Sequence, residues 1–227
     1  MSKVAPGVTR TYRVAMAVAR PIIRSWGRLE VEGLEHLPES GPVLVAANHD
    51  SYWDPLAIGL AGLPRRQIQA LAKAELWSTP GLGPILNGMG QIPIDRGKGD
   101  AHAMDRALAE LADGACIGIF PEGTRSRARE LRARAGIGRL AQDVDGTRVV
   151  CCTVAGTVDV IRVPKRPQVR VRFFPPEGGQ IQAGESPAEF SVRLLAEIRR
   201  EAPIVPSGRS KEANRQLAGE EEPEDAA

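Results

Sequence analysis

The sequence predicts an α/β fold, in which a single domain holds a mixed, largely parallel central sheet flanked by helices. Short apolar segments alternate along the chain with longer amphipathic ones, which is the pattern of strands and helices in such a sheet. Hydrophobic residues make up 42% and charged residues 26% of the 227 residues, a composition typical of domains with a substantial core. Aromatic residues contribute only 4%, so we expect that core to consist mainly of Ala, Val, Ile and Leu.

Strands are predicted where apolar and β-branched residues run for a few positions between turn residues. These segments are Leu29–Val31, Val43–Ala47, Ile68–Leu71, Gln91–Ile94, Cys116–Phe120, Val149–Val154 and Val169–Phe173. Helices are predicted where apolar residues recur at helical spacing, over Pro55–Leu60, Asp100–Ala112, Leu131–Gln142 and Pro187–Glu201. The uncharged stretch Gly81–Ile94 holds four Gly and two Pro, so we expect a loop before the strand there.

The segment Arg10–Arg28 is predicted to form a kinked amphipathic helix or two short ones, because Pro21 interrupts it. At 100° per residue the arginines fall in one narrow stripe, and they are Arg10, Arg13, Arg20, Arg24 and Arg28. Apolar side chains cover the opposite side, namely Tyr12, Val14, Met16, Val18, Ile22, Ile23 and Trp26. This pattern is typical of a helix in the interface of an anionic membrane; the alternative is a helix docked on the domain with its arginines in water.

We therefore expect three parts: an amphipathic membrane-contacting segment 1–27, a domain 28–206, and a disordered acidic tail 207–227. The formal net charge is +2, and the tail carries three basic and six acidic residues, which leaves +5 on the remainder. A mildly basic body suits an anionic substrate or membrane surface. The charge is too weak to predict a nucleic-acid partner.

Three cysteines, of which Cys151 and Cys152 are adjacent, form a poor disulfide framework and predict packing residues in a reducing, cytosolic setting. The start of the chain has no secretory signal pattern, and no apolar run approaches the roughly 18 residues of a membrane span. Histidines and cysteines lack zinc spacing, so we expect no metal site.

The most suggestive polar segment follows the apolar strand Val43–Ala47, at the kind of strand end where α/β sheets bind ligands. Here His49 precedes Asp54 by five positions, and Asp54-Pro55 resembles a helix start. A carboxylate bonded to one ring nitrogen of a histidine leaves the other nitrogen as a base. The alternative is that Asp54 only caps a helix and that His49 is an ordinary polar loop residue.

A second polar segment, Phe120–Arg127, follows the Cys116–Phe120 strand. Backbone amides around Gly123 and the arginines at 125 and 127 could bind a phosphate. Lys73 and Arg96 follow other strands, so four basic groups could converge at one edge of the sheet. The alternative is a glycine-containing turn with solvated arginines.

Three segments together carry a family resemblance. Asn48-His49 with Asp54, then Gly90-x-Ile92-x-x-x-Arg96, then Phe120-Pro121-Glu122-Gly123-Thr124-Arg125 resemble, in this order, the glycerolipid acyltransferase family. Within it the chain is most similar to bacterial 1-acylglycerol-3-phosphate acyltransferases. Ala72–Leu76 also matches a common stretch of that family, and the likeness covers roughly residues 25–175.

The resemblance implies that a fatty acyl group moves from an acyl thioester, either acyl-CoA or acyl carrier protein, to the free hydroxyl of lysophosphatidate. The product is phosphatidate, a step of phospholipid biosynthesis and lipid metabolism, and no cofactor beyond the co-substrate is implied. His49 becomes the general base and Asp54 the partner that orients it. The resemblance places substrate binding at Lys73, Arg96, Glu122, Gly123, Thr124 and Arg125. It also implies peripheral attachment to the cytoplasmic side of the membrane through the N-terminal helices.

Two positions depart from the family pattern. Cys151 stands where a proline is usual, and Arg134 stands where a lysine is common. Acceptor identity and acyl-chain preference therefore stay open. The alternatives are an acyltransferase for another lysophospholipid or a glycolipid, and a non-catalytic module that binds membranes or anions.

Overall fold

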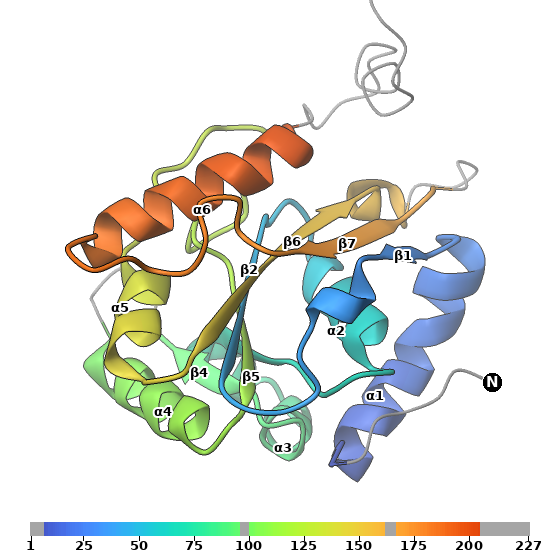
Figure 1. The fold of residues 1–227 in the computed structure, drawn as a ribbon. Coiled ribbons are helices and arrows are strands. Elements are labelled where there is room, and N and C mark those ends of the chain that lie inside the picture. Colours follow the sequence, from blue (N-terminus) through green and yellow to red (C-terminus); the bar gives the residue numbers. More distant parts are fainter. Residues whose placement is uncertain (1–6, 96–99, 162–166, 205–227) are drawn as a thin grey trace, which may run out of the picture.

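The structure is a computed structural model that describes residues 7–95, 100–161 and 167–204. Within these ranges the strands form one mixed sheet (Figure 1). The strand order is β1-β7-β6-β2-β5-β3-β4. Every neighbouring pair is parallel except β6 and β7. The strands are β1 (Glu30–Glu32), β2 (Val43–Ala47), β3 (Gln69–Lys73), β4 (Ile92–Ile94), β5 (Cys116–Ile119), β6 (Arg148–Ala155) and β7 (Arg170–Phe174).

Helices cover both faces of this sheet (Figure 1). The α-helices are α1 (Arg10–Arg20), α2 (Asp54–Gly62), α3 (Leu82–Gly88), α4 (Ala101–Ala112), α5 (Gly136–Asp143) and α6 (Pro187–Glu201). Shorter helical turns are η1 (Pro21–Trp26), η2 (Leu34–His36), η3 (Ala74–Ser78) and η4 (Thr157–Asp159). Side chains of α1 and α2 belong to one hydrophobic core, and those of α4, α5 and α6 belong to the other. The predicted α/β class is confirmed.

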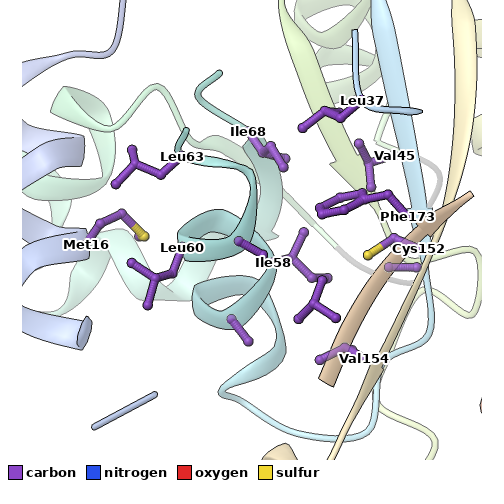
Figure 2. Close-up of a cluster of buried hydrophobic side chains, with 14 of the residues drawn as sticks. Met16, Leu37, Val45, Ile58, Leu60, Leu63, Ile68, Cys152, Val154 and Phe173 are labelled. Carbon is purple, nitrogen blue, oxygen red and sulfur yellow. The ribbon is translucent and has the colours of Figure 1, made fainter. Parts of the chain in front are cut away.

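The central strand β2 shows why the sheet is buried on both sides. Val43 and Val45 face the core on the α2 side, whereas Leu44 and Ala46 face the core on the α4–α6 side. An unbroken apolar run is what a parallel strand with two covered faces requires. Figure 2 shows the α2-side core, in which Ile58 of α2 belongs to the same cluster as the sheet residues Val45 and Phe173.

The N-terminal helix divides its apolar side chains between two environments. Tyr12 and Met16 of α1 are buried in the α2-side core, whereas Val14, Val18 and Ile22 are 63%, 70% and 38% exposed. The apolar side chains are therefore divided between the core and the surface. At about 100° per residue the arginines of α1 occupy about 280–360° of the wheel, the buried Tyr12 and Met16 about 200–240° and the exposed valines about 40–80°. Apolar side chains thus flank the arginines on both sides, and docking on α2 leaves one of these flanks exposed.

Pro21 changes the type of helix rather than ending it. It has no N–H to donate to the preceding turn, and the chain continues as the π-helical segment Pro21–Trp26. The Gly27 N–H closes this segment on the Ile22 carbonyl at 2.9 Å, which is the five-residue spacing of a π-turn. The predicted interruption is thus confirmed as a local widening of the helix.

Two helices differ from the sequence expectation. Helix α3 forms in the predicted loop, where the Trp77 indole N–H donates to the Asn87 side chain at 2.7 Å and so supports a helix that its glycines disfavour. Helix α5 begins at Gly136 and not at Leu131. The Arg134 N–H donates to the Pro121 carbonyl at 2.8 Å, so the backbone before Gly136 pairs with the turn after β5 and not with a preceding helical turn.

Two of the predicted features lie outside the described residues: the side chain of Arg96 and the tail 207–227. Among the helices of the described ranges, none combines the length and the apolar character that a membrane crossing requires.

The contact between α5 and α6 gives a stability test. A Cβ at Gly138 would overlap the carbonyl oxygen of Pro187, which is backbone and cannot swing aside. Gly138→Ala should lower the free energy of unfolding by about 1–3 kcal/mol, measured by urea denaturation. Gly136→Ala on the same helix is the control, because its Cβ would meet nothing closer than the Met104 sulfur at 4.0 Å. An equal effect of both substitutions would contradict this packing.

Candidate active site

The candidate site forms where three adjacent parallel strands end. Strands β5, β2 and β6 lie side by side, and the chain leaves them at Phe120, Asn48 and Gly156. Because parallel strands present their carboxyl ends at one edge, loops far apart in sequence meet there. These loops bring His49, Glu122 and Thr157 into one cluster of buried polar side chains.

Asn48 fastens the loop that follows β2 to strand β6. Its side-chain amide donates to the Val154 carbonyl at 2.8 Å, and its side-chain carbonyl accepts the Val154 N–H at 2.8 Å. This pair replaces the backbone bonds that another strand residue would make. The loop therefore leaves the sheet at a fixed point directly before His49.

The carboxylate of Asp54 organises that loop. It is fully buried and accepts the N–H groups of Asp50 and Ser51 at 2.6 and 2.7 Å. The Thr157 hydroxyl donates to its other oxygen. These donors offset the cost of removing a charge from water, and Asp54 also begins helix α2, where a negative charge is favourable.

The same carboxylate holds the ring of His49, with His49 Nδ1 and Asp54 Oδ2 3.0 Å apart. Since an ionised carboxylate can only accept, Nδ1 carries the proton of this bond. The lone pair of the neutral ring is then at Nε2. The contact between the two side chains is one of the two arrangements that the sequence left open, and it leaves Nε2 able to accept a proton.

The backbone and ring of His49 are fixed by other groups. The ring stacks on Phe120 with centroids 4.1 Å apart and planes 16° from parallel. The His49 N–H donates to Glu122 Oε2 at 3.0 Å, and the His49 carbonyl accepts the Ser126 N–H at 2.8 Å. The ring therefore has little freedom to leave its position against Asp54.

A buried ionic cluster lies beside His49. The guanidinium of Arg199, from α6, contacts the carboxylates of both Asp50 and Glu122. Burial opposes ionisation of Asp50, but hydrogen bonds from Arg199 and Ser126 outweigh it and hold the pKa of that carboxyl below its usual value. Burial raises the pKa of Glu122, and the contacts with Arg199 and the His49 N–H oppose that shift.

The predicted substrate-binding residues lie in different surroundings. Glu122 is occupied by Arg199 and the His49 backbone, whereas Thr124 is exposed. The Arg125 guanidinium lies 3.5 Å from the ring centre of Tyr52, a residue 74% exposed. Lys73 ends β3 and pairs with Glu75 at 2.6 Å. In the described part of the chain, Lys73 forms no hydrogen bond or ion pair with the loop around His49.

Gly123 permits the close approach of a further arginine. It has φ of +70°, and a Cβ there would overlap the side chain of Arg134. Both residues line a cavity of about 420 Å³ whose wall is mostly apolar. The apolar wall includes Leu71, Ile94, Met104, Ile119, Phe120 and Ile137.

Several residues of the site were not predicted. Three of them lie within the segments that the sequence singled out, but the pattern did not indicate what their side chains contact. These residues are Asp50, Tyr52 and Phe120. Arg199 lies far away in a regular amphipathic helix, where a basic residue in the last turn is ordinary. Only the folded contact reveals it.

A family model described as Acyltransferase matches residues 28–155. That is more than half of the chain, and the protein belongs to the acyltransferase family. The matched part contains His49, Asp54 and Glu122 but not Arg199. The resemblance carried by the motifs is confirmed.

Several individual proteins are similar to this chain in sequence. The 1-acyl-sn-glycerol-3-phosphate acyltransferase of Bacillus subtilis is 28% identical over 131 residues, 58% of this chain and 65% of that protein. The enzyme of the same name from Borreliella burgdorferi is 32% identical over 134 residues, 57% and 52% of the two chains. An uncharacterized protein of Mycobacterium leprae is 27% identical over 176 residues, 70% and 46%. The alignments thus span between 46% and 65% of these relatives.

The fold has a counterpart among solved structures. The crystal structure of the 1-acyl-sn-glycerophosphate (LPA) acyltransferase PlsC from Thermotoga maritima matches with a TM-score of 0.57 and 20% identity. The match covers 88% of this chain and 86% of that one. It therefore includes most of the chain outside the family match.

The ion pair of Asp50 predicts a pH-dependent stability. Its lowered pKa keeps it charged in the folded state at a pH where the unfolded carboxyl, with a pKa of about 3.9, is already protonated. The stabilisation is present above that value and is lost as the pH falls through the folded-state pKa. Asp50→Asn should cost about 1–3 kcal/mol at pH 7, with the difference shrinking toward pH 3. Urea unfolding at several pH values measures it, and a difference independent of pH would contradict the ion pair.

Proposed function

We propose that this protein transfers a fatty acyl group from an acyl thioester to the free hydroxyl of 1-acylglycerol-3-phosphate, giving phosphatidate. The observation that carries the proposal is the His49–Asp54 pair, held at the carboxyl ends of the strands with Nδ1 facing the carboxylate. Membership of the acyltransferase family and the names of the Bacillus and Borreliella relatives support this reaction.

The proposed chemistry is a direct transfer. Nε2 of His49 removes the proton of the acceptor hydroxyl while its oxygen attacks the thioester carbonyl. The C–O ester bond forms, the C–S bond breaks, and the imidazolium returns the proton to the departing sulfur as a thiol. Asp54 stabilises the imidazolium through Nδ1, and the face of Phe120 adds a favourable contact with that cation. No acyl-enzyme forms in this scheme.

The surroundings of His49 support a substrate with an anionic head and an aliphatic chain. Arg125 and Arg134 are near the Glu122-Gly123 turn, and arginines bind phosphate oxygens through a two-pronged fit. The cavity of about 420 Å³ behind that turn offers an apolar wall for a hydrocarbon chain. Lys73, Arg96 and Thr124 stay proposed contacts of the head group on the strength of the motifs alone.

Replacing the base tests the chemistry. His49→Ala should lower thiol release from acyl-CoA in the presence of lysophosphatidate by about 10²- to 10⁴-fold, because general-base assistance is lost. Free thiol is followed spectrophotometrically, and phosphatidate is identified by mass spectrometry. An unchanged melting temperature shows that the variant is folded. Wild-type rates in His49→Ala would refute the mechanism.

A panel of acceptors tests the substrate. With one acyl-CoA donor, lysophosphatidate should be used at a higher kcat/KM than lysophosphatidylcholine or a glycolipid, because only it offers a phosphomonoester. Equal use of all acceptors would contradict the assignment to phosphatidate synthesis. Vesicle binding with no thiol release from any acceptor would instead favour a non-catalytic module.

We also propose that α1 holds the protein peripherally on the cytoplasmic side of an anionic membrane, as the predicted segment 1–27 implies. Val14, Val18 and Ile22 expose apolar surface, and the exposed Arg13 and Arg24 lie beside it. Apolar side chains can enter the interface while arginines meet anionic head groups. Both kinds of contact come from one surface of the helix.

The double variant Val14→Ser/Val18→Ser should weaken binding to vesicles of phosphatidylglycerol and phosphatidylcholine by at least about 10-fold, because two apolar side chains no longer leave water. Sedimentation with the vesicles measures the bound fraction. Val192→Ser is the matched control, since Val192 is 57% exposed on α6. Unchanged binding of the double variant, or an equal loss with the control, would exclude α1 as the contact.

A further inference from the structure

We propose that Arg199 is a positioning residue for His49, acting from α6 through the carboxylates of Glu122 and Asp50. The inference rests on the proposed function, because it takes His49 as the base. Arg199 lies outside the segment that the family model matches, 28–155, and belongs to none of the motifs. Helix α6 thus completes a site whose other residues come from strand ends.

The guanidinium of Arg199 uses all three of its nitrogens. Nη2 donates to both carboxylate oxygens of Glu122, at 2.6 and 2.7 Å, and Nε donates to one of them at 3.2 Å. Nη1 and Nη2 donate to the two oxygens of Asp50 at 3.0 and 2.9 Å. The Arg199 side chain is only 14% exposed. A planar fork can bridge two carboxylates in this way, whereas the compact ammonium of lysine cannot.

Each of the two carboxylates is connected by hydrogen bonds to the main chain of His49. Glu122 Oε2 accepts the His49 N–H at 3.0 Å. Asp50 accepts the hydroxyl of Ser126, and the Ser126 N–H donates to the His49 carbonyl at 2.8 Å. Both backbone polar groups of His49 are therefore bonded to residues that Arg199 fixes directly or through one further contact.

The positive charge of Arg199 is a second reason why an arginine suits this position. Asp50 and Glu122 are neighbouring carboxylates in a largely buried region, and Arg199 forms an ion pair with each of them. Without it, two like charges would repel each other where their interaction is poorly screened. They would also repel a phosphate that approaches His49. Arg199 thus holds the loop together and keeps the site open to an anionic substrate.

Helix α6 offers a matched comparison. Arg193, on the same helix, pairs with Glu185 at 2.9 Å and with Glu197 at 3.6 Å, and its side chain is 24% exposed. Among the residues that the structure describes, neither of these carboxylates forms a hydrogen bond or ion pair with the loop around His49. A role confined to the stability of α6 would give Arg193 and Arg199 similar effects, whereas a positioning role belongs to Arg199 alone.

The experiment compares Arg199→Met, Arg199→Lys and Arg193→Met in the full chain, with acyl-CoA and lysophosphatidate as substrates. Folded fractions are determined by circular dichroism, and rates are expressed per folded molecule. Arg199→Met should lower kcat by about 10- to 100-fold, the size of effect that a small displacement of a catalytic group produces, with the KM for acyl-CoA changed by less than about threefold. Arg199→Lys should fall between wild type and Arg199→Met, and Arg193→Met should keep the wild-type kcat.

A rescue separates positioning from loss of structure. Adding Asp50→Asn and Glu122→Gln to Arg199→Met removes the uncompensated charges but keeps an oxygen that can accept the His49 N–H, so part of the lost kcat should return. Wild-type kcat in Arg199→Met would overturn the inference, as would an equal loss in Arg193→Met. If Arg199→Met does not fold, wild-type kcat in Arg199→Lys would overturn it. Activity in His49→Ala would instead defeat the proposed function, so the two failures are distinguishable.

Discussion

The buried carboxylate of Asp54 is the constraint on which the rest of the site depends. It accepts hydrogen bonds from the N–H groups of the two residues after His49 and from a hydroxyl in the turn after β6. These bonds connect two loops to the start of α2. A charge this deeply buried is costly unless donors surround it, and here the donors are the loop itself. The loop therefore has one favourable shape, and in that shape the ring of His49 meets the same carboxylate.

Sheet topology then determines what else can reach His49. Because β2 lies between β5 and β6, the loops after all three strands share one edge, and the segment that begins at Phe120 passes next to the segment that begins at Asn48. Helix α6 crosses the face of the sheet and contributes Arg199 near its end. The site thus combines local turns, which the motifs encode, with one long-range contact that depends on the packing of the whole domain.

The sequence could predict the parts whose signals are local. The bounds of β2 and α6 agree with prediction, because an apolar run ends abruptly at Asn48 and a Ser186–Glu189 capping box begins the last helix. His49 and Asp54 could be singled out because both lie within seven positions of the end of β2. Helix α3 could not be predicted from its glycine-rich sequence, because the hydrogen bond from the Trp77 indole to Asn87 forms only in the folded chain. Arg199 could not be found, since no spacing relates it to a loop 150 residues earlier.

The proposed chemistry requires that Asp54 fixes the tautomer of His49 and leaves Nε2 free to accept a proton. Nitrogen-15 NMR of the full chain, with the His49 signals assigned by comparison with His49→Gln, measures this directly in the neutral form of the ring. We expect a proton on Nδ1 and an unprotonated Nε2, with that pattern lost in Asp54→Ala. A neutral ring protonated at Nε2 would contradict this tautomer, because Nδ1 could then not donate to the carboxylate. Nε2 would also not be free to accept the proton of the acceptor hydroxyl.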